Sequence, residues 1–322
     1  MIVRLLTLAV SLVAGISVAN ACTEGRDQDG IVPKNNLKVT TAYFKAGQTM
    51  TEETFNRIIN GVGSIYAPII EALGAKLVIE SDWEDATVNA FASRESGKYK
   101  VNMFGGLARH PATTEDGLAL VVCHEIGHHV GGFPKKSVLW GSMWASNEGQ
   151  SDYFATTKCL RKYFEATKNS AQVLSRMAVP APVQEKCFAS WGQSKDHAIC
   201  VRIALAGQSM GNLFAALRRS TTNPDFATPI TAAVSATNDN HPDPQCRLDT
   251  YFQGGLCTVS HTVNLNDKDE RIGACTDYSK LGARSKCWFK PSVAGFQNNN
   301  SRVANSNTRT STNGGFQGGR GN

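Results

Sequence analysis

The chain of 322 residues lacks most features of nucleic-acid-binding and membrane proteins. No carboxylate follows Asp277, so much of the net charge of +6 belongs to the C-terminal end and is weak evidence for a nucleic-acid partner. After residue 18, no apolar run approaches the roughly 18 residues that a membrane span needs. No two of the nine cysteines have CxxC spacing, which argues against a cysteine-rich structural zinc site. We therefore expect no nucleic-acid partner and no membrane span in the mature chain.

The N-terminus has the three parts of an export signal. Arg4 provides the positive charge, residues 5–18 the apolar core, and Ala19-Asn20-Ala21 a cleavage site of small residues. We expect a signal peptide over residues 1–21 and a mature protein that begins near Cys22, in the periplasm or outside the cell. A cysteine at this position leaves a lipid anchor open, although Ala19 replaces the aliphatic residue usual in lipoproteins.

Export makes disulfides the expected use of most cysteines. Eight of the nine lie at or beyond Cys123, which predicts that bridges fasten the C-terminal half, with a connectivity that residue order leaves open. Cys123 itself lies inside an apolar run, and we expect it to be a buried free thiol.

The N-terminal third divides into a lead-in, a helix and a small sheet. Residues 22–38 are mostly polar and predict a flexible lead-in. Apolar residues at helical spacing predict a helix over residues 51–73. Strands are expected over residues 76–79, 86–92 and 98–104, and the last two are expected to pair across a turn.

The rest of the chain predicts one catalytic domain and a tail. The domain is expected over residues 39–295, with a C-terminal portion rich in cysteine and a core helix over residues 198–217. Residues 296–322 are dominated by Asn, Ser, Thr, Gly and Arg, which cannot bury enough apolar surface to fold. We expect a disordered tail there.

One predicted helix carries an HExxH motif. The helix begins at the capping residues 113–116 and ends at Gly131-Gly132. His124 and His128 are four residues apart, so both imidazoles lie on one face and can bind the same ion. Glu125 points beside that ion, where it can take a proton from metal-bound water.

A second motif supports this interpretation over an ordinary helix with incidental histidines. The segment Asn147-Glu148-Gly149-Gln150-Ser151-Asp152 opens the next predicted helix, which runs to about Lys168. Glu148 and Asp152 again share a helical face. Two histidines and one carboxylate would leave a coordination position of zinc open for water, as hydrolysis requires.

Together the two motifs resemble the gluzincin metallopeptidases, in which an HExxH helix precedes a helix with an NExxSD segment. The separation of twenty residues from His128 to Glu148 is similar to the spacing of the thermolysin-like members. The resemblance implies one Zn²⁺ bound by His124, His128 and Glu148. It also implies that Asp152 hydrogen-bonds a ligand histidine, His124, and fixes its tautomer.

Three further segments resemble the HtpX-like branch of that group. They are Val88-Asn89-Ala90-Phe91-Ala92, Gly105-Gly106-Leu107, and His241-Pro242 followed by Arg247. In that branch Asn89, Ala90 and Phe91 would belong to an edge strand above the zinc, where a substrate backbone adds as another strand. The third-ligand glutamate is usually farther from the HExxH motif in that branch than here.

The role of His241 stays open at this point. The residue could lie in a polar surface turn, donate a hydrogen bond to the tetrahedral oxyanion, or occupy the open position of zinc. Arg247 is a second candidate for the oxyanion donor. His129 would point about 100° away from His128 on a helix, so we leave it out of the site.

These features predict an α+β, zincin-like fold. We expect a small antiparallel sheet with its edge strand over a two-helix zinc site, and a helical C-terminal portion tied by disulfides. The function expected is an exported zinc-dependent endopeptidase that hydrolyses protein or peptide substrates, with Glu125 as general base. The alternatives are a zinc-stabilised binding or chaperone-like protein of the cell envelope, and a hydrolase of non-peptide amides.

Overall fold

The computed structural model describes residues 30–43, 50–138 and 141–292. The expected signal peptide (1–21), Cys22 and the expected tail (296–322) lie outside the described residues. The chain up to Lys290 forms one unit, and of the second unit, Pro291–Asn322, only the first two residues are described. Within the described residues, the first unit is mixed α and β with a small sheet.

Helix α1 (Glu52–Glu71) forms where apolar residues recur at helical spacing. Its N-cap is Thr51, whose side-chain oxygen accepts a hydrogen bond from the amide of Thr54. One face of the helix is buried in the main hydrophobic core, through Phe55, Ile58, Ile59, Val62, Tyr66 and Ile70. The helix predicted over residues 51–73 is therefore confirmed.

The sheet contains β1 (Lys76–Asp82), β2 (Ala90–Glu95) and β3 (Lys98–Phe104), in the order β1-β3-β2. Strands β2 and β3 form the expected antiparallel hairpin, with Gly97 in its turn at a φ of +69°. Strand β1, however, pairs with β3 in parallel. The expectation of an antiparallel sheet is wrong for β1, because the segment from β1 to β2 crosses over and reverses the chain before β2 begins.

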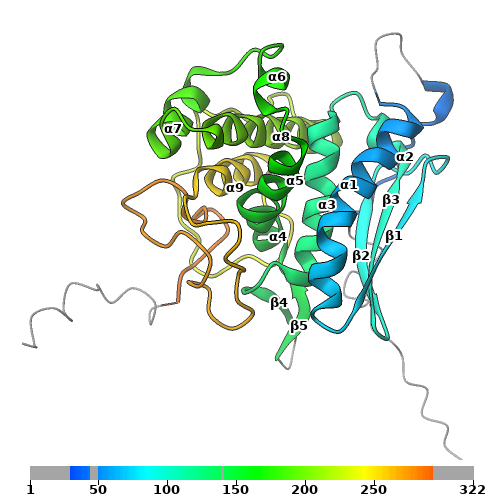
Figure 1. Ribbon diagram of the computed structural model, residues 1–322, viewed down its shortest axis with the longest axis horizontal. Helices are drawn as coiled ribbons and strands as arrows, with labels where there is room; N and C mark the ends of the chain where they lie inside the picture. The colour runs from blue at the N-terminus through cyan, green and yellow to red at the C-terminus, as the bar shows by residue number, and fades with distance from the viewer. Residues whose placement is uncertain (1–29, 44–49, 139–140, 293–322) are drawn as a thin grey trace, which may run out of the picture. The chain divides into compact units, whose positions relative to one another are not determined.

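Helix α3 (Glu115–Val130) is the centre of the fold. It follows the short helix α2 (Gly105–Arg109) and is capped by Thr114, which accepts a hydrogen bond from the amide of Gly117. Every residue from Gly117 to His129 is buried. Figure 1 shows the sheet and α1 on one side of α3 and the later helices on the other.

After α3, a small hairpin of β4 (Lys135–Val138) and β5 (Gly141–Ser146) leads into a continuous helical run. The run consists of α4 (Glu148–Phe154), a π-helical turn η2 (Ala155–Cys159) and α5 (Leu160–Thr167). It ends at Lys168, as the sequence predicts, where the backbone is left-handed.

The C-terminal helices pack around the other side of α3. They are α6 (Ser170–Leu174), α7 (Ala181–Trp191), α8 (Lys195–Leu217) and α9 (Pro244–Leu256), and a short 3₁₀ helix η1 (Thr41–Tyr43) lies near the N-terminus. Helix α8 is long and apolar enough to cross a membrane, but 78% of its most apolar stretch is buried within the fold. It is the expected core helix.

Four disulfides join eight cysteines: Cys123–Cys159, Cys187–Cys200, Cys246–Cys287 and Cys257–Cys275. They fasten the C-terminal half, as expected, and are compatible with an exported protein. The prediction of a free thiol at Cys123 is wrong. The turn η2 places Cys159 against α3, a long-range contact that the apolar run around Cys123 does not show.

The start of the described chain differs from the expected flexible lead-in. Ile31 and Val32 are buried in the main hydrophobic core. The amide of Ile31 donates to the carbonyl of Ala90 (2.8 Å), and the amide of Val39 donates to that of Ala86 (2.9 Å). The mostly polar composition of residues 22–38 did not predict the burial of these two apolar residues or the backbone bonds of this segment to the strand region.

Candidate metal centre

His124 and His128 project from the same face of α3. Their rings lie perpendicular to each other with centroids 4.8 Å apart, and both side chains are fully buried. Glu148 comes from the first turn of α4, which Asn147 caps by accepting a hydrogen bond from the amide of Gln150. The HExxH helix α3 and the NExxSD helix α4 thus bring three side chains together.

These three side chains form a group that could hold a metal ion. One ligand atom from each of His124, His128 and Glu148 lies within 4.8 Å of the other two. The Nε2 atom of His124 lies 3.2 Å from Oε2 of Glu148, and that of His128 lies 3.8 Å from Oε1. Neither Nε2 atom hydrogen-bonds any described residue although both are buried. Since buried polar atoms are nearly always satisfied, two bare lone pairs facing a carboxylate fit a metal site.

The other ring nitrogens of the two histidines are held in place. Nδ1 of His128 donates to the carbonyl of Ser146 (2.8 Å), and Nδ1 of His124 is 2.7 Å from Oδ1 of Asp152. A proton on each Nδ1 leaves each Nε2 as the lone pair that a metal would take. The structure therefore places Asp152 behind His124, as the sequence predicts.

The pKa values of the two histidines are shifted in opposite directions. Burial alone would lower the pKa of His124, but Asp152 outweighs it and raises that pKa to about 9. Burial lowers the pKa of His128 well below its ordinary value.

Arg247 occupies a different place from the one expected. Its Nε and Nη2 atoms bind the two carboxylate oxygens of Asp152, at 2.8 and 2.7 Å. The hydroxyl of Tyr251 donates to the same carboxylate at 2.8 Å. The third nitrogen, Nη1, donates to the carbonyl of Ile31 at 2.6 Å. Arg247 thus holds Asp152, and through it His124, which the interpretation of Arg247 as an oxyanion donor did not foresee.

His241 lies at the candidate metal centre and not in a surface turn. Its Nε2 atom is 3.4 Å from Oε2 of Glu148 and donates to the carbonyl of Gly30 at 2.7 Å. Only 10% of its side chain is exposed. The surface-turn alternative is therefore excluded, whereas the two roles at the metal centre remain.

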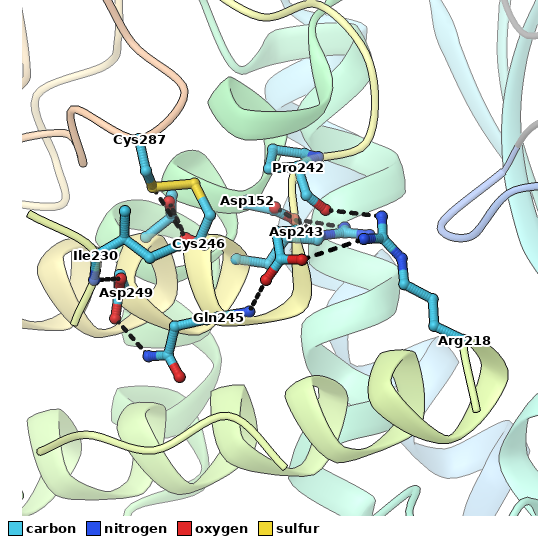
Figure 2. Close-up of a disulfide and its surroundings, with 11 residues drawn as sticks. Asp152, Arg218, Ile230, Pro242, Asp243, Gln245, Cys246, Asp249 and Cys287 are labelled. Carbon is cyan, nitrogen blue, oxygen red and sulfur yellow. Dashed lines mark hydrogen bonds and ion pairs between the residues drawn. A yellow bond between two sulfur atoms is a disulfide. The ribbon is translucent and has the colours of Figure 1, made fainter. Parts of the chain in front are cut away.

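The loop that carries His241 is fixed at its end, as Figure 2 shows. Arg218 donates to the carbonyl of Pro242 (3.2 Å) and lies 3.4 Å from the carboxylate of Asp243. Asp243 in turn caps α9 by accepting from the amide of Gln245. In the first turn of α9, Cys246 is bridged to Cys287.

Glu125 is fully buried on α3, directly after His124. Among the described residues, none hydrogen-bonds either of its carboxylate oxygens, and Oε2 lies 4.0 Å from Nε2 of His128. Burial raises the pKa of Glu125 to about 7. A carboxylate without a partner beside the candidate metal position is able to accept a proton there.

Lys136 belongs to the site and was not predicted. Its Nζ atom lies 2.8 Å from Oε1 of Glu148, and its side chain is 16% exposed. Burial would raise the pKa of Glu148, but His241, Lys136 and His128 together lower it well below its ordinary value. The lysine comes from β4, a strand of a hairpin that the sequence analysis does not predict.

The predicted substrate-binding edge, residues 89–91, lies beside the candidate metal centre and already contacts another segment of the chain. Asn89 precedes β2, Ala90 begins it and Phe91 follows, with Phe91 opposite Asn102 of β3. The Asn89 side chain bonds both the amide and the carbonyl of Val32, at 3.4 and 3.3 Å. The edge of the sheet therefore meets the start of the described chain at this point.

His129 stays outside the site, as expected. Its ring is stacked between those of Tyr99 (4.8 Å) and Trp144 (4.9 Å), and its Nε2 atom donates to the carbonyl of Lys100. This histidine is a buried part of the packing between α3, the sheet and the hairpin.

In comparisons with known proteins, no family model, curated protein or solved structure matched this chain. The interpretation of the site therefore depends on its geometry and on the sequence motifs.

Proposed function

We propose that this protein is an exported zinc-dependent endopeptidase of the gluzincin type. The observation that carries the proposal is the convergence of His124, His128 and Glu148 beside the carboxylate of Glu125, where no described residue hydrogen-bonds the two Nε2 atoms or that carboxylate. A purely structural metal site would have no use for Glu125, whereas hydrolysis needs a base at that place. A three-stranded sheet followed by the HExxH helix α3 and the NExxSD helix α4 supports a zincin-like fold.

The donor set favours zinc. Two imidazole nitrogens and one carboxylate oxygen are the ligands of hydrolytic zinc sites, which keep a position open for water. When bound, zinc would lower the pKa of that water towards about 7 and polarise a substrate carbonyl. His124, His128 and Glu148 would hold the ion, and Asp152 would orient His124.

The chain's own residues supply the remaining steps of hydrolysis. Glu125 would take the proton from the attacking water and pass it to the amine that leaves. His241, whose Nε2–H already donates to a carbonyl oxygen 2.7 Å away, would donate to the substrate oxygen as negative charge develops on it. Replacement of the C–N bond by a C–O bond then gives a carboxylic acid and an amine.

A peptide is the substrate that the surroundings favour. Beside the centre, the carbonyl of Ala90 and the side chain of Asn89 bond the backbone of another segment of this same chain, which supports a substrate that offers peptide groups. Non-peptide amides would leave these hydrogen-bonding groups unused.

Metal removal tests the proposal directly. We expect the purified protein to contain one zinc per chain, to cleave casein, to lose cleavage on dialysis against a chelator and to regain it with zinc. Elemental analysis and release of peptides measure both properties. A protein that holds zinc stably but cleaves neither casein nor peptides would support the zinc-stabilised binding protein instead.

Replacing His241 separates its two roles. Since its Nε2–H donates to a carbonyl in the structure, we expect His241→Ala to keep zinc and to lower kcat by about 10²–10³-fold. Steady-state kinetics on a fluorogenic peptide, with zinc content measured in parallel, checks this. A rise in kcat would show instead that His241 blocks the open position of the metal.

A further inference from the structure

The described chain begins with a segment that follows the edge of the sheet into the metal centre. Residues 30–39 run antiparallel to residues 86–90. The amide of Ile31 donates to the carbonyl of Ala90, and near the other end Lys38 forms an antiparallel bridge with Thr87. A segment from the N-terminal side of α1 therefore lies against the residues that lead into β2 and against its first residue, Ala90, on the side that β3 does not cover.

Two carbonyl groups of this segment face residues of the centre. The carbonyl of Gly30 accepts from Nε2 of His241 at 2.7 Å, and the same nitrogen lies 3.4 Å from Glu148. The carbonyl of Ile31 accepts from Arg247, whose other nitrogens bind Asp152. The backbone of Gly30 and Ile31 is thus held by groups that touch a candidate metal ligand or its supporting carboxylate.

The fit at Gly30 is close enough to exclude any side chain. A Cβ atom at this position would lie 1.7 Å from the carbonyl oxygen of Ala90 and 2.6 Å from Oδ1 of Asn89. Next to this contact, the side chain of Asn89 bonds both the amide and the carbonyl of Val32. Glycine therefore allows a backbone-to-backbone approach that any other residue would push apart.

We propose that the bent segment Gly30–Val32, in which the amide of Gly30 donates to the carbonyl of Val32 at 3.3 Å, occupies part of the place of a substrate backbone and holds the enzyme in a low-activity state. The proposal rests on the proposed function. A substrate backbone would use the carbonyl of Ala90, the side-chain carboxamide of Asn89 and the Nε2–H of His241, and each of these already has a partner in the segment. A substrate must displace the segment before it binds. Its apparent affinity is therefore its intrinsic affinity multiplied by the fraction of molecules in which the edge is free.

Gly30→Ala in the full chain tests this occupancy, because the added Cβ collides with the carbonyl of Ala90. The probe is a fluorescent peptide with the sequence of residues 30–37, and its binding is measured by anisotropy in the Glu125→Gln background, where it is not cut. We expect Gly30→Ala to bind the probe at least about tenfold more tightly than its parent. On an active background, KM for a peptide substrate should fall about tenfold with kcat unchanged.

Leu37→Ala is the matched control, because Leu37 lies in the same segment with its side chain 40% exposed. It should leave the probe affinity and KM unchanged. Ile31→Ala is a second test variant, in which a buried anchor of the segment is shortened without a backbone collision. Thermal unfolding followed by circular dichroism shows that each variant is folded.

Equal probe affinity in the parent, Gly30→Ala and Ile31→Ala proteins, all folded, would overturn the proposal. The same holds if Gly30→Ala lowers the unfolding temperature and leaves KM unchanged, since the segment would then be only structural. If the probe binds only the released variants but no variant cleaves peptides, the occupancy stands and the proposed peptidase activity fails.

Discussion

Glu125→Gln is expected to abolish peptide cleavage while the protein keeps its zinc. Glutamine has nearly the same shape as glutamate but cannot take a proton from the attacking water, which should lower kcat by about 10²–10⁴-fold. The three candidate ligands are untouched, and no described residue depends on a hydrogen bond to Glu125, so the fold should not change. Steady-state kinetics with zinc analysis on the same sample measures both effects.

Glu115→Gln is the control for this experiment. Glu115 lies on the same helix, but its side chain is 42% exposed and pairs with Arg57 at the surface. Its replacement should change neither kcat nor zinc content. Full activity of Glu125→Gln would rule out Glu125 as the base, and loss of zinc in that variant would show that Glu125 is a ligand.

Asp152→Ala is expected to have the second largest effect, on metal affinity and on stability together. The change removes the carboxylate that orients His124, and loss of such a partner costs about 10–100-fold in zinc affinity. It also leaves the guanidinium of Arg247, which is 2% exposed, buried without its counter-ion. Breaking a buried ion pair in this way destabilises a fold by about 3–5 kcal/mol. Denaturant titration and competition with a zinc chelator measure the two effects.

Two further variants show whether the unpaired charge is the cause. Asp152→Ala combined with Arg247→Met should recover much of the lost stability but not the zinc affinity, because the buried charge is gone and His124 still lacks its partner. Asp269→Ala removes a carboxylate whose pair with Arg271 is solvent-exposed, and should alter neither property. If Asp152→Ala binds zinc as tightly as the parent, Asp152 does not orient the site.

The parts of the site that the sequence predicts are those set by local geometry. His124, Glu125 and His128 are placed relative to one another by the pitch of one helix, and Glu148 and Asp152 by the pitch of another. The structure brings these two helices together with the candidate ligands facing each other. The spacing of residues along a helix therefore predicts which side chains share a face without any knowledge of tertiary contacts.

The parts that were missed depend on contacts between distant segments. Lys136 reaches Glu148 from a hairpin without a clear period-2 pattern, and Arg247 turns towards Asp152, 95 residues away. The Cys123–Cys159 bridge depends on how η2 packs against α3. The burial of Ile31 depends on an edge strand about sixty residues later in the chain. No local periodicity encodes any of these pairings.

The bridge joins Cys123 and Cys159 at a sequence separation of 36, and the loop that it closes contains all three candidate ligands, the candidate base and Asp152. In the chain-entropy description, such a closure restricts the unfolded chain by about 4 kcal/mol. Even when the surrounding helices come apart, His124, His128 and Glu148 would remain tethered inside one covalent ring, at high effective concentration for one another. Recapture of an ion after partial unfolding is then a local search within that ring, independent of the rest of the chain.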